Sequence, residues 1–391
     1  MMKQRYIALD VLRGLTVAFM CIVNNPGSWS HMYAPLRHAG WEGCTPTDLV
    51  YPFFVFCMGC AMAWSFAKYD ILTKDAAWKI VKRGIGIFLV GLLLNLYPFF
   101  PTSPDKSMTF WQNYGYWLAH KRIFGVLQRI AGCYIVSGLV ILLAKKDSRK
   151  IFWSIVALCA VYTGILVAFG NEPGPFTVDG NVSSRIDVAL VGSDHVYHGY
   201  RLSDGSRADF DPEGLLGALT GACTALLGFL AGSMIRSSKK KYADSGLKQT
   251  AEAEACSPVG IVARLFFFGC ASLAAGMILS IWIPVSKPLW SASYVFYAGG
   301  WSLVALAFLA YIIDVKGHER FFVPAKAMGM NALAAFVLSG VIAKTLPLIG
   351  FNQAKVFGAT EFTSFVFSLM FMVLIFCFQW FFYKKNIVIK L

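Results

Sequence analysis

Residues that could transfer a proton gather in one polar segment, residues 28–46, and at the start of the apolar stretch that follows it. The segment contains His38, and Asp48 comes ten residues later. Histidine is the side chain best suited to exchange a proton near neutral pH. The simpler interpretation is an ordinary loop histidine, with Asp48 as the cap of the next helix. The position beside Asn24 and Trp41, at the mouth of a membrane segment, favours catalysis.

Polar and charged residues also interrupt the apolar stretches. Asp10 and Arg13 are three residues apart and share a face of a helix, and Asn24 falls on nearly the same stripe. Gln128 and Arg129 lie just inside another stretch. A charge at the bilayer centre costs roughly 2.5–3.5 kcal/mol, so such residues face the bundle interior and find partners there. A structural ion pair and a polar-lined cavity both fit the first stripe. Arg129 needs a carboxylate, a carbonyl dipole or a bound phosphate.

Apolar helices are the elements that must position these residues. Of the 391 residues, 57% are hydrophobic and 14% are charged, whereas soluble domains average about 25% charged residues. A hydrocarbon core of about 30 Å takes roughly 20 apolar residues per helical crossing. Stretches of that length are 6–27, 47–67, 83–101, 124–144, 151–169, 214–235, 261–283, 290–313, 327–347 and 362–383. We therefore expect an all-α integral membrane protein with about ten transmembrane helices.

Basic residues divide unevenly between the two ends of these helices. With the first residue in the cytoplasm, the loops on that side hold more than twice as many Lys and Arg residues as the loops on the other side, which follows the positive-inside rule. Both termini are therefore expected in the cytoplasm. The chain divides into a first helical half, 1–235, a flexible cytoplasmic linker, 236–260, and a second half, 261–391. The loops 28–46 and 170–213 then face outward.

Composition argues against several other classes of protein. The net charge is +14, but the basic residues cluster between apolar stretches, so topology explains them and no nucleic-acid partner is expected. The ten cysteines indicate neither a disulfide framework nor a metal site. Motifs for ATP binding, GxSxG hydrolases and HExxH zinc enzymes are absent from the sequence. No cleavage site follows the first apolar stretch, so we expect it to be retained as a helix.

Eight short blocks carry a resemblance to a known family. They are ALDVLRGLTVAFMCIVNNPG (8–27), RHAGWEGCTPTDLVYPFFVFCMG (37–59), GVLQRIAG (125–132), RIDVALVGSDHVY (185–197), FDPEGLLG (210–217), PVSKPLWSASY (284–294), DVKG (314–317) and GMNA (329–332). With these blocks in this order, the sequence resembles the heparan-α-glucosaminide N-acetyltransferases and their bacterial relatives over essentially its whole length.

The resemblance implies a chemistry. Members take acetyl-CoA on the cytoplasmic side and acetylate a glucosamine amino group on the far side. The resemblance implies that His38, in an H-A-x-W-x-G motif, is the catalytic residue, and it maps Asn24 onto the asparagine of a V-N motif. Two departures stand out: Glu42 replaces the asparagine of the lysosomal form, and the extra lumenal N-terminal domain of that form is not expected here. A homodimer is compatible with the resemblance, and we expect a bacterial inner membrane.

The residues can be assigned roles in such a transfer. His38 is expected to act as general base or to form an acyl-imidazole, Asn24 to donate to the thioester oxygen, and Asp48 to be the third catalytic residue. Residues expected to bind the acetyl-CoA donor are Arg13, Arg83, Gln128, Arg129, Arg236 and Lys326. Residues expected to bind the amino sugar are Trp41, Asp187, Asp211 and Glu213.

Two other functions stay open at this stage. The first is O-acylation of a periplasmic glycan, which uses the same His38 and the same donor. The second is secondary transport of a sugar, in which the polar stripe lines a permeation path.

Overall fold

The structure is a computed structural model that describes residues 6–69, 71–244 and 250–389. In these ranges every regular element is a helix. Eight helices of the described chain are long and apolar enough to cross a membrane, and the count is up to nine if one bent pair forms a single span. The expectation of an all-α, multi-pass membrane protein is confirmed, and the predicted number of crossings exceeds this count by one.

The candidate spans follow the predicted stretches closely. They are α1 (Ile7–Asn24), Pro46–Lys68 with α2 (Val50–Ser65), α5 (Val126–Leu143), α6 (Ser148–Phe169), α8 (Ala218–Asp244), α10 (Pro258–Leu279), Ala292–Val315 with α11 (Ala292–Ala310), and α15 (Glu361–Lys384). The bent pair joins Glu319–Met330, which contains α12 (Val323–Met330), to α13 (Ala332–Leu348) at 68°. The shorter helices include α4 (Phe110–Ala119), α7 (Val182–Val191), α9 (Ala251–Cys256) and α14 (Gln353–Phe357).

The remaining predicted stretch, 83–101, differs from the structure. It lies in α3 (Lys74–Leu96), which begins earlier, ends earlier and carries basic residues in its first half. The uncharged part, 84–96, is about 20 Å long at 1.5 Å per residue, which is short of a hydrocarbon core of about 30 Å.

The predicted linker is largely helical. Helix α8 continues to Asp244, and α9 follows a cap in which the Thr250 side chain accepts a hydrogen bond from Ala253 N. Residues 245–249 lie outside the described residues. Where the structure describes residues 236–260 they are mostly helical, because residues 236–244 continue the backbone hydrogen bonds of α8 and the chain then enters α9 and α10. The two proposed halves also interleave, since α1 packs against α12 and α15.

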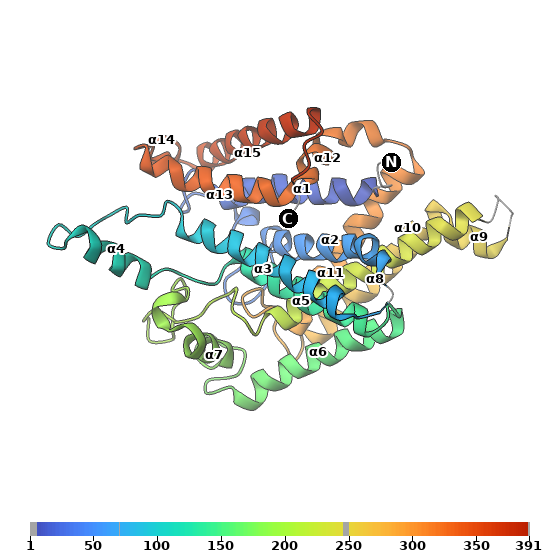
Figure 1. Ribbon diagram of the computed structural model, residues 1–391, viewed down its shortest axis with the longest axis horizontal. Coiled ribbons are helices and arrows are strands. Elements are labelled where there is room, and N and C mark those ends of the chain that lie inside the picture. Colours follow the sequence, from blue (N-terminus) through green and yellow to red (C-terminus); the bar gives the residue numbers. More distant parts are fainter. Residues whose placement is uncertain (1–5, 70, 245–249, 390–391) are drawn as a thin grey trace.

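The long connections gather at one end of the bundle, which we call the loop end. It comprises the segments 25–49, 97–125, 170–217 and 280–291, and it lies at the left of Figure 1 with α4, α7 and α14. At the opposite end, which we call the basic end, α1 and α3 begin and α2, α5 and α8 finish. Lipid-embedded helices must satisfy their backbone groups internally, so irregular backbone is concentrated outside the spans.

Glycines let α2 and α8 approach closely. A Cβ atom added at Gly59 of α2 would collide with the Ala225 carbonyl oxygen, and one at Gly228 of α8 would collide with the Phe56 carbonyl oxygen. Small residues at such positions allow close backbone packing where lipid removes the hydrophobic drive between helices. This contact fixes α2, and the turn that precedes α2 carries Asp48.

Replacing Gly228 by Ala should force α2 and α8 apart. Overpacking of this kind costs typically about 1–3 kcal/mol, so we expect a lower melting temperature of the purified protein in detergent. The matched control is Gly164→Ala in α6, where an added Cβ meets nothing within 4 Å and no loss is expected. Equal melting temperatures for the two variants would contradict this close approach.

Candidate active site

His38 and Asp48 meet at the loop end as the sequence predicts. His38 Nδ1 lies 2.7 Å from Asp48 Oδ1. The Asp48 side chain is 1% exposed, whereas that of His38 is 42% exposed. A buried carboxylate thus holds one nitrogen of an imidazole that is partly open to solvent.

Backbone and side-chain donors hold the second oxygen of Asp48. Asp48 Oδ2 accepts hydrogen bonds from Ala39 N at 2.9 Å, Thr45 N at 3.0 Å and Thr45 Oγ1 at 3.0 Å. The bonds with Thr45 form a capping box at the start of Pro46–Leu49. Asp48 therefore takes part both in the helix cap and in the contact with His38. The two roles are compatible because Oδ2 serves the cap and Oδ1 serves His38.

The contact fixes the tautomer of His38. An ionised carboxylate only accepts hydrogen bonds, so a bond of 2.7 Å to Asp48 requires the hydrogen on Nδ1 of a neutral imidazole. Nε2 then carries the lone pair. An oriented imidazole with a free Nε2 can act as a general base or as a nucleophile.

Two other segments hold the His38 loop in place. Trp41 Nε1 donates to the Phe176 carbonyl oxygen at 2.6 Å, and the Trp41 ring packs edge-on against Tyr200 and Phe210. Gly43 N donates to the Val285 carbonyl oxygen at 2.8 Å. Trp41, expected as a sugar contact, therefore also joins the His38 loop to the long loop 170–217.

Lys287 is a residue of this site to which the sequence assigned no role. Its Nζ lies 3.2 Å from Asp48 Oδ1 and 3.0 Å from His38 Nδ1. It belongs to the block PVSKPLWSASY, but nothing in the spacing of the chain indicated that residue 287 would meet residue 48. The only available signal was a charged residue within a motif of uncharged ones.

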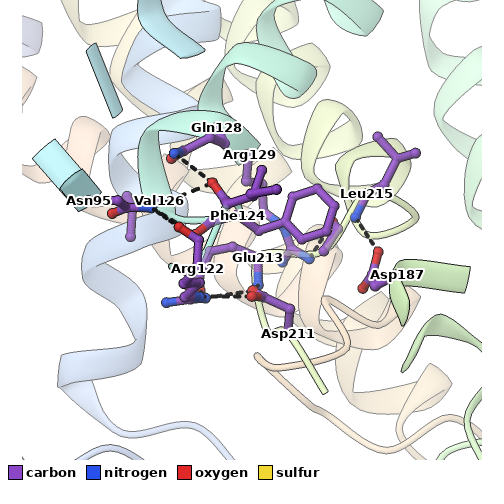
Figure 2. Close-up of polar contacts among 12 residues, drawn as sticks. Asn95, Arg122, Phe124, Val126, Gln128, Arg129, Asp187, Asp211, Glu213 and Leu215 are labelled. Carbon is purple, nitrogen blue, oxygen red and sulfur yellow. Dashed lines mark hydrogen bonds and ion pairs between the residues drawn. The ribbon is translucent and has the colours of Figure 1, made fainter. Parts of the chain in front are cut away.

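Asp211 and Glu213 are paired inside the protein. The Arg122 guanidinium binds Asp211 through Nε at 2.8 Å and through Nη2 at 2.5 Å, and it also bonds Glu213 (Figure 2). Burial acts to lower the pKa of Arg122, but these two carboxylates outweigh it and hold the pKa above its usual value. Arg122, which lies in the basic run before α5, thus pairs with both carboxylates and compensates one of their two negative charges.

Asp187 is fully buried in α7. Its Oδ1 accepts a hydrogen bond from Leu215 N at 2.9 Å (Figure 2), and its Oδ2 has no partner among the described residues. Burial raises the pKa of the Asp187 carboxyl to about 6, although the Leu215 N–H and Arg129 act in the opposite direction. In this conformation the three carboxylates expected to bind an amino sugar are turned into the loop end.

Gln128 and Arg129 lie in the first turn of α5, at the loop end. Arg129 Nη2 donates to the Gly214 carbonyl oxygen at 3.2 Å, and the guanidinium lies 5.5 Å from the Trp290 ring centroid. Its Nε and Nη1 have no partner in the described part of the chain. Gln128 Nε2 donates to the Ile123 carbonyl oxygen at 2.9 Å. The expected carbonyl dipole is thus one partner of Arg129.

A cavity of about 860 Å³ brings Arg13 and Arg83 together. Its wall is mainly apolar, is formed largely by residues of α2, α3, α5, α12 and α13 with Arg13 of α1 and Phe382 of α15, and includes Tyr134 and Asn331. Along α2 the wall runs from Ser65, at the basic end, to Phe54, a rise of about 16 Å. Arg129, which was expected to bind the donor together with Arg13, is not among the wall residues, so the cavity is more apolar than the sequence predicted.

Aromatic residues connect the outer limit of the cavity to Asp48. Tyr51 donates its hydroxyl to the carbonyl oxygen of Val126, a wall residue, at 2.9 Å and packs edge-on against Trp290. Trp290 contacts Tyr294, whose hydroxyl donates to the Asp48 backbone oxygen at 2.6 Å. The cavity therefore ends close to the turn that carries Asp48, on the far side of this aromatic group.

The other predicted residues lie farther apart. Asn24 is the last residue of α1, exposed at the loop end. Arg236 Nη1 donates to the Ala63 carbonyl oxygen at 3.2 Å, and Lys326 pairs with Glu319 at 3.3 Å, both at the basic end. The six residues expected to bind the donor thus fall into three groups. Arg13 and Arg83 share a cavity, Gln128 and Arg129 lie at the start of α5, and Arg236 and Lys326 lie at the basic end.

Comparisons with known proteins point to one family. A model described as "Heparan-alpha-glucosaminide N-acetyltransferase, catalytic" matches residues 5–176. The human heparan-alpha-glucosaminide N-acetyltransferase is 28% identical over 383 residues, covering 85% of this chain and 52% of the human protein. The mouse protein of the same name is 26% identical over 389 residues, covering 88% of this chain and 54% of its own length. The chain spans about half the length of these relatives.

The buried Asp187 should make stability depend on pH. Its pKa is about 6 in the folded protein, above the usual 3.8 of an aspartate side chain, so the folded state favours the protonated form. This contribution is complete below about pH 4 and is lost as the pH rises through 6, by on the order of 3 kcal/mol at roughly 1.4 kcal/mol per unit. Asp187→Asn keeps the acceptor for Leu215 N and removes the buried charge.

We therefore expect the melting temperature of Asp187→Asn to exceed that of the wild type at pH 7.5, and we expect this difference to shrink as the pH falls towards 4. The control is Asp244→Asn, the same substitution at an exposed position of α8, and the pH-dependent difference should be absent there. A melting temperature of Asp187→Asn below the wild type at pH 7.5 would show that the charge of Asp187 is stabilising.

Proposed function

Because the chain belongs to the heparan-alpha-glucosaminide N-acetyltransferase family, we propose that it moves an acetyl group across a membrane. The donor is acetyl-CoA on the cytoplasmic side. The acceptor is the amino group of glucosamine, or of a glycan that ends in glucosamine, on the other side. The observation that carries the proposal is the hydrogen bond of 2.7 Å between His38 Nδ1 and Asp48 Oδ1, since it leaves Nε2 free to take a proton.

The reaction needs a base because a protonated amine cannot attack a carbonyl carbon. His38 Nε2 takes the proton as the amine nitrogen bonds to the acetyl carbon, and the carbon–sulfur bond breaks to release the CoA thiolate. The imidazolium then returns the proton to the thiolate. In the alternative route, Nε2 attacks the thioester first and forms an acyl-imidazole. Both routes need the His38 tautomer that carries its hydrogen on Nδ1. The proposed role of Asn24 is to donate a hydrogen bond to the thioester oxygen.

The cavity supports a donor that enters from the basic end. Phosphate groups bind guanidinium groups well, and Arg13 and Arg83 are the basic residues of the cavity wall. The apolar wall suits the thin arm that carries the thioester. From Phe54, the outermost wall residue of α2, to Asp48 is six residues, about 9 Å along a helix. We propose that the arm reaches His38 past Tyr51 and Trp290.

The acceptor approaches from the loop end. His38 is the exposed member of its pair with Asp48, and Trp41, three residues further, offers an apolar ring face to a sugar. Asp211 and Glu213 act in this proposal through Arg122, by shaping the wall of the site. The basic end faces the cytoplasm, in accordance with the positive-inside rule, and a bacterial inner membrane remains the proposed location.

Purified protein incubated with acetyl-CoA and glucosamine should yield CoA and N-acetylglucosamine, measured by mass spectrometry. His38→Ala should lower kcat by about 10²–10⁴-fold, the usual contribution of a general base, with an unchanged melting temperature. His31→Ala is the matched control, because His31 lies exposed in the same loop, and it should keep full activity.

Four results separate the alternatives. Full turnover by a folded His38→Ala variant would refute the proposed catalyst. Proteoliposomes that accumulate glucosamine without acetyl-CoA would indicate a transporter. Acetylation of hydroxyl groups in place of amines would indicate an O-acyltransferase. CoA release in the absence of acceptor, at one equivalent per protein, would identify the acyl-imidazole route.

A further inference from the structure

We propose that Lys287 is a positioning residue of the His38–Asp48 pair, and that its charge sets the pH range in which His38 Nε2 is free to accept a proton. The inference rests on the proposed function. Its basis is that Lys287 Nζ stands 3.2 Å from Asp48 Oδ1 and 3.0 Å from His38 Nδ1 at once.

The backbone around Lys287 is fixed, so this placement is built into the fold. The Lys287 carbonyl oxygen accepts a hydrogen bond from Trp290 N at 3.0 Å. The neighbouring Ser286 N donates to Ser291 Oγ at 3.1 Å, and Gly43 N donates to Val285 O at 2.8 Å. The Lys287 side chain is 21% exposed, so it reaches Asp48 from a segment that is already docked on the His38 loop.

Only one assignment of hydrogens satisfies all three side chains. His38 Nδ1 cannot donate to Asp48 and accept from Lys287 at the same time. The contact with Asp48 is the shorter, and Lys287 can donate to Asp48 Oδ1 instead. Two donors, Nδ1–H and the ammonium, therefore share one carboxylate oxygen, and Lys287 touches His38 as a neighbouring cation.

The charge of Lys287 acts on the protonated state of His38. With Lys287 present, Asp48 is already compensated, so an imidazolium leaves the trio with a net charge of +1. Without Lys287, the same imidazolium would compensate Asp48. A like charge at this range disfavours the charged form of its neighbour. Lys287 therefore keeps His38 available as a base at lower pH and makes its imidazolium a better proton donor to the thiolate.

Cys44, Tyr200 and Tyr294, which interact with Asp48, are uncharged in the assay range, and Arg37, the chain neighbour of His38, is paired with Glu361 at 3.3 Å. Burial raises the pKa of the Cys44 thiol to about 12 and raises the pKa of Tyr200 well above its usual value. Tyr294 faces Asp48 from α11 as a neutral donor, through its hydroxyl. Lys287 is thus the cation in direct contact with the pair among the described residues.

The test is the ratio of kcat/KM of Lys287→Met to that of the wild type, measured from pH 5.5 to 9. The titration of the acceptor amine cancels in this ratio. We expect a ratio near one at high pH that falls to about one-tenth at low pH, because loss of a neighbouring like charge moves the acid limb upward by about one pH unit. Lys287→Arg keeps the charge and should restore the wild-type limb.

The control is Lys355→Met, the same substitution at an exposed position of α14, which should give a ratio of one throughout. Lys287→Gln serves as the second neutral variant if Lys287→Met does not fold. A ratio that is constant with pH would overturn the proposal, because a purely structural role lowers activity equally at every pH. If His38→Ala keeps the activity of the wild type, that result would instead refute the proposed function.

Discussion

One buried carboxylate organises the loop end of this protein. The Asp48 side chain is 1% exposed, and a buried charge is tolerated only when it is paired and hydrogen-bonded. Here the donors come from the His38 loop, from Thr45 and from Lys287 in the segment before α11. Because Lys287 belongs to a different segment from the other donors, satisfying Asp48 requires the segment before α11 to meet the His38 loop, and their meeting creates the site.

The rest of the loop end supports that meeting. Trp41 joins the His38 loop to the long loop 170–217, and Arg122 closes that loop onto the start of α5 by pairing with Asp211 and Glu213 (Figure 2). The bundle below supplies the rigid base, since close glycine contacts hold α2 against α8. The mainly apolar cavity beside α2 reaches towards this region from the basic end, which is the arrangement that the proposed transfer between two sides of a membrane needs.

Apolar length and local spacing predicted much of this structure. Nine of the ten predicted stretches correspond to candidate spans or to the bent pair, because the thickness of a bilayer sets the length of its helices. The stretch 83–101 was less well predicted, since the basic residues of α3 occupy the same helix as its apolar part. His38 and Asp48 could be chosen together because they lie ten residues apart in one loop.

Pairing between distant segments could not be predicted. The carboxylates of loop 170–213 looked available to a cationic sugar, but Asp211 meets Arg122 from another loop. Lys287 meets Asp48 across 239 positions of the chain, and the cavity wall includes Asn331, at the bend where α12 ends and α13 begins. Single-sequence spacing carries no information on which loop docks against which, because that depends on the packing of the whole bundle.

The central claim is that Asp48 holds the hydrogen of neutral His38 on Nδ1 and leaves Nε2 free. The most direct measurement is the ¹⁵N NMR spectrum of the protein labelled at its six histidines, with the His38 signals identified by their loss in His38→Gln. At a pH where the ring is neutral, we expect a protonated Nδ1 and an unprotonated Nε2. A hydrogen on Nε2 would contradict the account, since the nitrogen that faces the substrates could then neither take a proton nor attack a thioester.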